Sequence, residues 1–569
     1  MRYFALASDY DGTLADHGTV RPSTFEALKR FRDSGRQLLL NTGREVPDLM
    51  SVFPEHEIFH WLIAENGAVL FEPATKTETL LAAPPPPQFV ETLQRRNVGP
   101  LYIGRVIVAT LDTQKEEVLE AIHELGLELQ IIFNKGALMA LPPGVNKATG
   151  LQACLKKIGL SLHNTVGVGD AENDHAFLNV CERSVAVANA LPALKEKADL
   201  MMDGSCGAGV AELIERILQD DLADVPAHHR AETIPLGNAD GKEIGVPVYG
   251  SNFLVAGTSG GGKSTLSTGF LERLVRSEYQ FCAIDPEGDY QNFEGALVMG
   301  DSRKEPKVEE ILQVLERPEN SVIVNLLGVE LDQRPAYFAS LFSRLRDLRS
   351  RTGRPHWIFL DEAHHLLPSS RETRHDMPVN ELNNAMLVTL EPDHLPESVL
   401  AAVDTLIAVG KQPGKTIQAF CHACNEECPR IERTELSKGE AIFWSRRLKG
   451  EPVKFSVAPC EKEHVRHSRK YASADLTPDR SFYFRGPEGK LNLRAQNLMT
   501  FAQLLQGVDD ETWLHHLRQG EYSQWFRENI KSDELADAAA AVEEDQSLNA
   551  AESRAKIKEQ IEERYTLPA

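Results

Sequence analysis

A glycine-rich segment near the middle of the chain restricts its fold more than any other sequence feature. The segment Gly257-Thr-Ser-Gly-Gly-Gly-Lys-Ser-Thr265 follows the apolar run Phe253-Leu-Val-Ala256 and opens a stretch with a helical pattern. In such a loop, backbone N–H groups surround phosphate oxygens, a lysine reaches the β- and γ-phosphates, and a hydroxyl ligates Mg²⁺. We therefore predict a nucleotide-binding parallel sheet whose phosphate-binding residues are Gly257, Gly260, Gly261, Gly262, Lys263, Ser264 and Thr265.

An acidic pair further along the chain supplies the second element that ATP hydrolysis needs. The apolar run Trp357-Ile-Phe-Leu360 ends in Asp361 and Glu362. Asp361 would hold the Mg²⁺ shell, and Glu362 would orient or deprotonate the attacking water. The sequence thus predicts an ATPase that uses ATP and Mg²⁺.

Length and composition predict a cytoplasmic protein of several domains. Single cores stop growing near ~250 to 300 residues, so a chain of 569 residues should hold about three units. The formal net charge of −23 gives no support to nucleic-acid binding, although a basic channel remains compatible with it. No apolar stretch approaches the ~18 residues that span a bilayer, so no membrane partner is expected.

Two carboxylates follow the first strand-like run of the chain. Tyr3-Phe-Ala-Leu-Ala-Ser8 leads into Asp9 and Asp11. Phosphoryl transfer to an aspartate uses such a pair, because one carboxylate attacks phosphorus while the other donates a proton to the leaving oxygen.

Further motifs follow in order and complete a recognisable set. They are Thr42 after the run Leu38-Leu-Leu-Asn41, Lys147 after a Pro-Pro-Gly turn, and Asp170 and Asp174 after the run Val166-Gly-Val-Gly169. Together with Asp9 and Asp11 they resemble the haloacid dehalogenase (HAD) superfamily of aspartyl-phosphate phosphatases, over about residues 1–220. The stretch Ala64-Glu-Asn-Gly-Ala68 is similar to the Cof-type or sucrose-phosphate-phosphatase-like branch.

This resemblance implies a fold and a role for each motif. The fold would be an α/β Rossmann-like core, residues 1–70 and 142–220, with an α+β cap at about 71–141. Asp9 would be the nucleophile, Asp11 the acid/base, and Thr42 and Lys147 the phosphate holders. Asp9, Asp11, Asp170 and Asp174 would form the Mg²⁺ region, Asp174 as an outer support. A small phosphate ester would be the substrate, and an inactive, degenerate fold is the alternative.

The central unit, residues 244–465 after a linker at 221–243, resembles the HerA-FtsK superfamily of motor ATPases. The likeness rests on the acidic turn Asp285-Pro-Glu-Gly-Asp-Tyr290 and on Asp361-Glu-Ala-His364. It implies an ATP-binding homo-oligomer. Leu390 and Glu391 stand where these motors usually carry a glutamine, which places DNA translocation in question. Arg446 and Arg447 could reach a neighbour's γ-phosphate or form a solvated edge.

A cysteine cluster raises the question of a structural metal. Cys421, Cys424 and Cys428 have metal-like spacing, and Cys460 or His464 could supply a fourth ligand for Zn²⁺. We favour reduced thiols, because a helix places cysteines at the same intervals. After them, residues 475–569 show apolar and aromatic residues at helical spacing, which predicts a small helical module with an aromatic core.

Three functional hypotheses follow. The leading one is a bifunctional enzyme, a Mg²⁺-dependent phosphomonoesterase fused to a HerA-like ATPase, with sugar phosphates or phosphorylated nucleic-acid ends as substrates. The second is an oligomeric, ATP-driven DNA translocase whose phosphatase-like domain serves recognition. The third is a phosphatase gated by a nucleotide-sensing ATPase.

Overall fold

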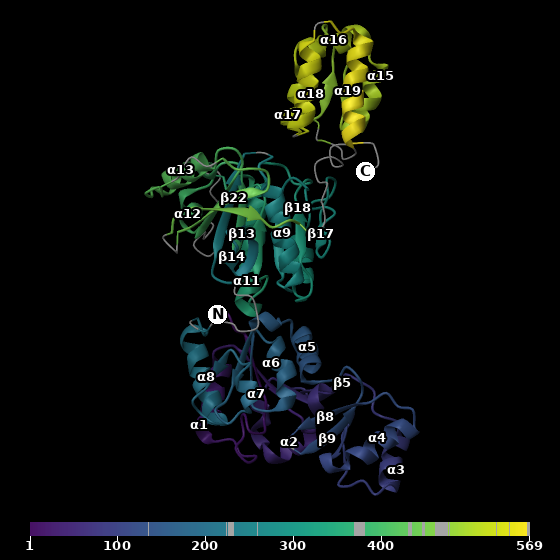
Figure 1. Cartoon of the computed structure of the whole chain (residues 1–569), viewed down its shortest axis with the longest axis vertical. Helices are drawn as coiled ribbons and strands as arrows, with labels where there is room; N and C mark the ends of the chain where they lie inside the picture. Colours follow the sequence, from purple (N-terminus) through teal and green to yellow (C-terminus); the bar gives the residue numbers. More distant parts are fainter. Residues whose placement is uncertain are drawn as a thin grey trace.

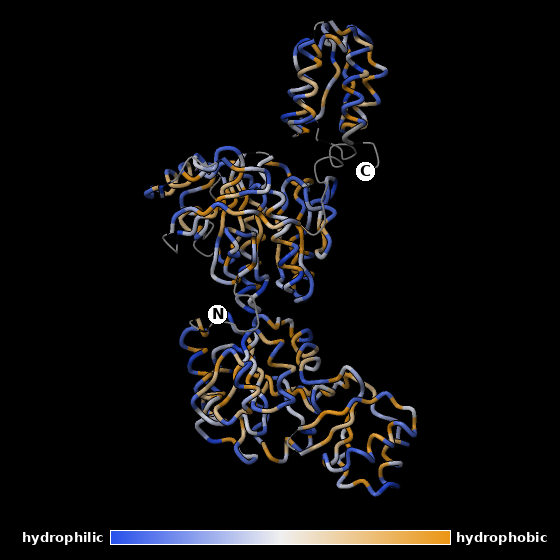
Figure 2. Tube along the Cα trace, in the orientation of Figure 1, coloured by the Kyte–Doolittle hydropathy of each residue, from blue (hydrophilic) through white to orange (hydrophobic). Residues whose placement is uncertain are grey.

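The computed structural model divides the chain into three bodies (Figure 1). It describes residues 1–134, 136–223, 225, 233–258, 260–368, 382–430, 435–446, 450–460, 476, 478, 480–530, 532–545 and 547–565. The predicted Arg447 and His464 lie outside these residues, as does part of the predicted linker. No helix in the described part is both long and apolar enough to cross a membrane. Hydrophobic residues occur in all three bodies (Figure 2), and each body has its own buried core.

The amino-terminal body is built on an eight-stranded sheet of order β12-β11-β10-β1-β2-β3-β4-β5. The strands from β12 to β3 are parallel, and β4 and β5 add an antiparallel edge. Its strands are β1 (Ala5–Ser8), β2 (Gln37–Asn41), β3 (Trp61–Ala64), β4 (Val69–Glu72), β5 (Thr77–Leu80), β10 (Thr165–Gly169), β11 (Arg183–Ala186) and β12 (Leu200–Met201). Its helices are α1 (Pro22–Asp33), α2 (Val46–Val52), α5 (Lys147–Ile158), α6 (His175–Val180), α7 (Pro192–Lys195) and α8 (Gly207–Asp220). Near-continuous apolar strands such as Ala5–Ser8 are buried throughout, as a sheet with helices on both faces requires.

A smaller α+β unit interrupts this body between β5 and α5. Its antiparallel sheet has the order β6-β7-β9-β8, and two helices share a separate apolar core with it. The elements are α3 (Pro87–Arg95), β6 (Tyr102–Ile103), β7 (Val108–Leu111), α4 (Lys115–Glu124), β8 (Gln130–Asn134) and β9 (Ala137–Leu141). Glu65 of the main body holds this unit, because its buried carboxylate accepts hydrogen bonds from the backbone N–H groups of Arg105, Val106 and Ile107 at 2.8, 2.8 and 3.1 Å.

The central body contains an eleven-stranded sheet of order β14-β13-β23-β22-β21-β15-β20-β19-β16-β18-β17. The part from β21 to β17 is parallel, and the four strands before it are antiparallel. Its strands are β13 (Thr233–Ala239), β14 (Lys242–Pro247), β15 (Asn252–Gly257), β16 (Phe281–Asp285), β17 (Leu297–Met299), β18 (Val322–Asn325), β19 (Trp357–Leu360), β20 (Ala385–Thr389), β21 (Thr405–Val409), β22 (Glu440–Ser445) and β23 (Val453–Val457). Its helices are α9 (Lys263–Arg276), α10 (Val308–Leu315), α11 (Arg334–Thr352), α12 (Glu397–Ala401) and α13 (Pro413–Cys424).

One element of this sheet differs from the sequence-based expectation. The stretch 221–243 is rich in Asp, Ala, Pro and His, which favoured a linker, yet β13 and the start of β14 lie within it. They form an antiparallel hairpin whose turn contains Asp240 and Gly241, both with positive φ. The apolar side chains Ile234, Leu236 and Val246 are buried. Their short alternating pattern was hidden among the polar residues around it.

The carboxy-terminal body is a helical module with a two-stranded hairpin. It comprises β24 (Phe482–Phe484), β25 (Leu493–Ala495), α15 (Leu498–Gly507), α16 (Asp510–Arg518), α17 (Glu521–Glu528), α18 (Asp533–Glu544) and α19 (Ala550–Tyr565). The aromatic residues lie in its core, where Trp513 and Tyr522 stack with ring centroids 4.4 Å apart. They are buried, as helical spacing of large apolar residues indicates.

Candidate active sites

The first candidate site lies where three parallel strands of the amino-terminal body end together. Asp9 follows β1, Thr42 follows β2 and Asp170 follows β10. Ser8 pairs in register with Leu40 on one side and with Val168 on the other. Because the carboxyl ends of adjacent parallel strands meet at one edge, these three polar residues are brought together there.

Lys147 enters the same site from the first turn of α5. Asn146 caps this helix, accepting from the backbone N–H groups of Ala148 and Thr149, which fixes where the helix begins. The Lys147 ammonium is 1% exposed and lies 2.5 Å from Asp9 Oδ1 and 2.6 Å from Asp174 Oδ1. The lysine therefore bridges two carboxylates that are far apart in sequence.

Asp170 and Asp174 are held by a compact turn. The other oxygen of Asp174 accepts hydrogen bonds from the backbone N–H groups of Asp170 and Ala171, both at 2.9 Å. The Thr13 hydroxyl donates to Asp170 Oδ1 at 3.1 Å. Asp174 contacts Lys147 directly, so it belongs to the central cluster instead of standing behind it.

The charge of this cluster suits a divalent cation. Oxygens of Asp9, Asp170 and Asp174 all lie within 4.8 Å of one another, and all three residues are buried. Burial, followed by the charge of Asp174, raises the pKa of the Asp9 carboxyl to about 7 even though Lys147 opposes the shift. Burial acts against the Lys147 ammonium, but Asp174 and Asp9 outweigh it and raise its pKa. One ammonium against three carboxylates leaves excess negative charge, and hard oxygen donors fit Mg²⁺.

Asp11 occupies a different position from the cluster. Arg44 forms a two-point ion pair with it, Nε to Oδ2 at 2.6 Å and Nη2 to Oδ1 at 2.8 Å, and also reaches Asp48. The hydrogen bond to Asp11 is the main cause that raises the pKa of the Arg44 guanidinium. The structure thus brings Asp9, Asp170 and Asp174 together but places the Asp11 carboxylate on Arg44, a residue to which the sequence analysis gave no role.

Thr42 and two asparagines complete the surroundings. Thr42 is 1% exposed, and its hydroxyl oxygen accepts from the backbone N–H of Arg44 at 3.1 Å. Asn173 donates to Asn66 Oδ1 at 3.0 Å, which connects the turn before Asp174 to the segment after β3. This pair was not among the predicted site residues. Asn66 has a positive φ of 52°, which is common for asparagine in tight turns, and the Asn66-Gly67 dipeptide was the signal of that turn in the sequence.

Comparison with known proteins agrees with this geometry. The family profile of haloacid dehalogenase-like hydrolases matches residues 6–97 and 102–214. The amino-terminal domain is a haloacid dehalogenase-like hydrolase domain. From here we call it the hydrolase domain. It covers about the first 230 residues.

Relatives of the hydrolase domain include two archaeal proteins. Phosphoglycolate phosphatase of Methanothermobacter thermautotrophicus is 28% identical over 226 residues, which are 38% of this chain and 98% of the relative. Phosphoglycolate phosphatase 2 of Saccharolobus solfataricus is 29% identical over 223 residues, 38% of this chain and 93% of the relative. A solved haloacid dehalogenase-like hydrolase from Bacteroides thetaiotaomicron is 20% identical, covering 38% of this chain and all of that one, with a TM-score of 0.33.

The second candidate site is the glycine-rich loop between β15 and α9. Gly257, Gly260 and Gly262 have positive φ values of 147°, 71° and 99°, conformations that side chains rarely adopt. A Cβ on Gly257 would lie 2.1 Å from the carbonyl oxygen of Val409. Lys263 is the first residue of α9, and its ammonium donates to the carbonyl oxygens of Gly257 at 2.7 Å and Thr258 at 3.3 Å. Ser264 and Thr265 follow in the same first turn.

The acidic pair lies at the same edge of the central sheet. Leu360 is level with Leu387 of β20, which is level with Leu254 of β15. Continuing that register places Asp361 and Glu362 at the carboxyl ends of the strands, beside Thr389 and the glycine-rich loop. Glu362 has a left-handed backbone, φ 40° and ψ 53°, which is unusual for glutamate and turns the chain sharply at this point.

His364 adds a contact that the sequence analysis did not assign. Its Nδ1 lies 3.6 Å from Glu362 Oε2 and 3.2 Å from the Thr389 hydroxyl. The histidine therefore connects the acidic pair to the end of β20. A histidine two positions after a candidate catalytic glutamate was the available signal, but its partner Thr389 is remote in sequence.

Arg446, predicted to reach a neighbour's γ-phosphate or to form a solvated edge, makes hydrogen bonds within its own chain. Arg446 donates to the carbonyl oxygens of Leu400, Ala401 and Val403 at the end of α12 and pairs with Glu426.

The predicted cysteine cluster forms in part, because the Cys421 and Cys428 side chains hydrogen-bond to each other. Within the described residues, Cys421, Cys424, Cys428 and Cys460 form no group of three that could hold a metal ion. Cys460 instead donates its thiol hydrogen to the carbonyl oxygen of Thr265 at 3.1 Å.

Proposed function

We propose that this chain is a Mg²⁺-dependent phosphomonoesterase that forms an aspartyl-phosphate on Asp9, joined to a central domain that hydrolyses ATP. The observation that carries the first half is Lys147, a buried ammonium between Asp9 and Asp174 with Asp170 beside them. This arrangement supplies a nucleophile, a phosphate holder and a cation site within one cluster.

The residues suggest the following chemistry. An Asp9 oxygen attacks phosphorus, and the bond from phosphorus to the leaving oxygen breaks while Asp11 gives that oxygen a proton. Water then attacks the aspartyl-phosphate, Asp11 takes the proton of the water, and Asp9 is released with inorganic phosphate. Lys147 and Thr42 hold the phosphate oxygens. Asp9, Asp170 and Asp174 would hold Mg²⁺, which offsets the negative charge of the phosphate and the carboxylates.

Asp11 must change partner before it can act. Both of its oxygens accept hydrogen bonds from Arg44. The Arg44 pair must therefore open before Asp11 can reach a leaving oxygen. A phosphate group entering the site offers Arg44 an alternative anion.

The substrate is proposed to be a small phosphate ester. Two relatives that the hydrolase domain matches along more than nine-tenths of their length are named phosphoglycolate phosphatases. Phosphoglycolate is therefore the first compound to test, beside sugar phosphates and phosphorylated oligonucleotide ends.

The ATP half of the proposal rests on the glycine-rich loop. A helix that begins with Lys263 directs its N–H groups and its ammonium at the same small space, an arrangement suited to a triphosphate. Glu362 and Thr389 lie at the neighbouring strand ends, where an attacking water would be positioned. A HerA-like ATPase assembled as a homo-oligomer is the corresponding proposal for the central domain.

The test is phosphate release from two substrate types by three proteins. Wild type, Asp9→Asn and Lys263→Ala are each given phosphoglycolate, a sugar-phosphate panel, phosphorylated oligonucleotides and ATP, with Mg²⁺. Loss of ester cleavage in Asp9→Asn alone and of ATP cleavage in Lys263→Ala alone would support two separate sites. If wild type cleaves no ester while DNA stimulates its ATP cleavage, the translocase hypothesis replaces this one.

A further inference from the structure

The two helices that begin with a phosphate-site lysine end at the same place, the junction between the hydrolase domain and the central domain. Helix α5 begins at Lys147 and has its C-cap at Gly159. Helix α9 begins at Lys263 and has its C-cap at Ser277. At 1.5 Å per residue, their 12 and 14 residues place the junction about 18 and 21 Å from the two lysines.

Arg354 of the central domain caps the helix of the hydrolase domain. Its guanidinium donates to the carbonyl oxygen of Gly159. The side chain is fully buried and also donates to Gln280 Oε1 at 2.8 Å and to the carbonyl oxygens of Leu315 and Glu316 at 3.0 and 3.1 Å. Burial lowers the pKa of Arg354 to about 10, so it remains a cation at neutral pH.

His163 of the hydrolase domain caps the helix of the central domain. Its Nε2 lies 2.8 Å from the carbonyl oxygen of Ser277, and its Nδ1 lies 2.8 Å from Glu182 Oε2. Both partners are hydrogen-bond acceptors, one on each side of the junction. The ring also stacks on Tyr279 of the central domain, with centroids 3.8 Å apart and planes 19° apart. His163 is thus fixed from both sides of the junction.

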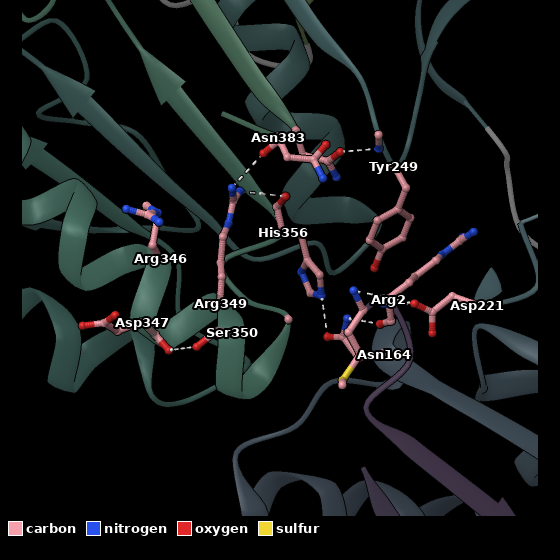
Figure 3. A pocket seen from close by; sticks show the side chains of 14 residues that line it. Arg2, Asn164, Asp221, Tyr249, Arg346, Asp347, Arg349, Ser350, His356 and Asn383 are labelled. Atoms are coloured by element: carbon pink, nitrogen blue, oxygen red, sulfur yellow. Dashed lines mark hydrogen bonds and ion pairs between the residues drawn. The ribbon is translucent and has the colours of Figure 1, made fainter. Parts of the chain in front are cut away.

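Further contacts hold the two domains in one arrangement around these caps. His356 Nε2 lies 3.2 Å from Asn164 Oδ1, and the Tyr249 hydroxyl donates to the carbonyl oxygen of His163 at 3.1 Å. Figure 3 shows His356 directed at Asn164 from the opposite domain. A Cβ on Gly353, the C-cap of α11, would lie 2.5 Å from Asn164 Nδ2. Clefts of about 500 and 440 Å³ border these contacts between the two domains.

We propose that Arg354 and His163 are positioning residues, each of which caps from the opposite domain the helix that carries a phosphate-site lysine. A cation at a helix C-terminus interacts favourably with the partial negative charge of its last carbonyl groups. Because a helix moves as a rod, its C-terminal cap helps to set where its first residue lies. Arg354 therefore positions Lys147, and His163 positions Lys263. This inference rests on the proposed function, and it makes each domain a regulator of the other.

The test uses the full chain and four variants at the junction. Arg354→Met removes the cation, Arg354→Lys keeps it, and His163→Gln removes the imidazole ring, with its stacking on Tyr279, while retaining a donor. Glu319→Gln is the comparison variant, because it breaks the exposed Lys156–Glu319 ion pair between the same two domains, near the end of α5, while the hydrogen bonds made by Arg354 and His163 stay in place. For each, kcat and KM for the phosphate ester, Kd for ATP and Tm are measured.

We expect each variant to affect the site of the opposite domain. Arg354→Met, a change within the central domain, lowers the phosphatase kcat by about tenfold, since misplacement of a phosphate holder is costly, and leaves the ATP Kd within about twofold. His163→Gln, a change within the hydrolase domain, weakens ATP binding by about fivefold and spares ester cleavage. Arg354→Lys recovers most of the phosphatase kcat, and Glu319→Gln changes neither site.

Other results overturn the inference. Each variant harming only its own domain's site, or both sites falling together with Tm, would give Arg354 and His163 a structural role alone. A wild type that cleaves no ester or binds no ATP defeats the proposed function and this inference with it. If the wild type is active at both sites but no variant affects the site of the opposite domain, this inference is wrong and the proposed function stands.

Discussion

Lys147 and Lys263 occupy matching places in two domains yet have opposite surroundings. Each is the first residue of a helix beside the carboxyl ends of parallel strands. Lys147 lies between the carboxylates of Asp9 and Asp174, whereas Lys263 donates to the neutral carbonyl oxygens of its own loop. In the first site the lysine is held by carboxylates, and in the second it is held by backbone carbonyl groups of the loop that precedes its helix.

The difference follows from what each sequence segment contributes. Three buried carboxylates repel one another unless opposite charge offsets them, and the Lys147 ammonium supplies part of that charge within the folded hydrolase domain. The glycine-rich loop contributes N–H groups and one ammonium, which are suited to bind the phosphate oxygens of a ligand. We therefore expect changes in the first site to affect both the cation and the reaction, and changes in the second to affect ATP alone.

Loss of the nucleophile should give the largest effect. Asp9→Asn should lower phosphate-ester cleavage by at least about 10⁴-fold, because no aspartyl-phosphate can form. The rate of ATP cleavage should stay within about twofold of wild type. When a phosphate ester with a radiolabelled phosphate is used, the label should remain bound to acid-quenched wild-type protein and should be missing from the Asp9→Asn protein. Equal labelling of both proteins would contradict the role of Asp9.

Loss of the second lysine should come next and should be confined to ATP. Lys263→Ala should lower ATP cleavage by about 10²- to 10³-fold, since the ammonium that meets the β- and γ-phosphates is gone. Ester cleavage should persist. Lys242→Ala, an exposed lysine of the same domain, serves as the control. Undiminished ATP cleavage in the Lys263 variant would show that the loop is not the site.

Removal of the acid/base should separate the two half-reactions. Asp11→Asn should lower steady-state turnover of an alkyl phosphate by about 10²-fold or more, because the leaving oxygen then departs without a proton. With p-nitrophenyl phosphate, whose leaving group needs no proton, a burst of nitrophenolate should precede slow turnover. Rapid-quench measurement decides this. A steady rate without a burst would place the role of Asp11 elsewhere.

The sequence predicted those parts of the sites that depend on strand ends. Asp9, Thr42 and Asp170 each follow an apolar run, so parallel pairing alone brings them together. The glycine-rich loop and Lys263 were equally visible, because the loop and the helix start are adjacent in the chain. The positions of these residues could be predicted because each depends on its neighbours along the chain.

Contacts that depend on tertiary docking could not be predicted from the sequence. The Arg44 pair with Asp11 links two loops, and its geometry decides which partner Asp11 has in this state. The contact of Asp174 with Lys147 and that of His364 with Thr389 likewise join segments distant in sequence. The helix caps by Arg354 and His163 require the relative placement of two domains, which no local pattern contains.

Acid should weaken cation binding at the first site. Because the pKa of Asp9 is raised to about 7, this carboxyl holds a proton below that pH, and Mg²⁺ must displace it. The apparent Mg²⁺ affinity of metal-free protein should fall by up to about tenfold per pH unit between pH 7 and 5 and level off above pH 8. Calorimetry in two buffers of different ionisation heat measures the released proton. A pH-independent affinity would contradict this assignment.

The smallest effect should come from the contact between the hydrolase core and its cap, which has no counterpart at the glycine-rich loop. The Glu65 carboxylate accepts three backbone N–H groups of residues 105–107. Glu65→Gln retains the shape but removes the charge and one acceptor, at a cost of about 1 to 3 kcal/mol. The hydrolase domain should melt a few degrees lower and show a raised KM for the ester, since the α+β unit is held less firmly against the core. ATP binding should not change, and a variant with altered ATP binding but unaltered KM would place this contact outside the hydrolase site.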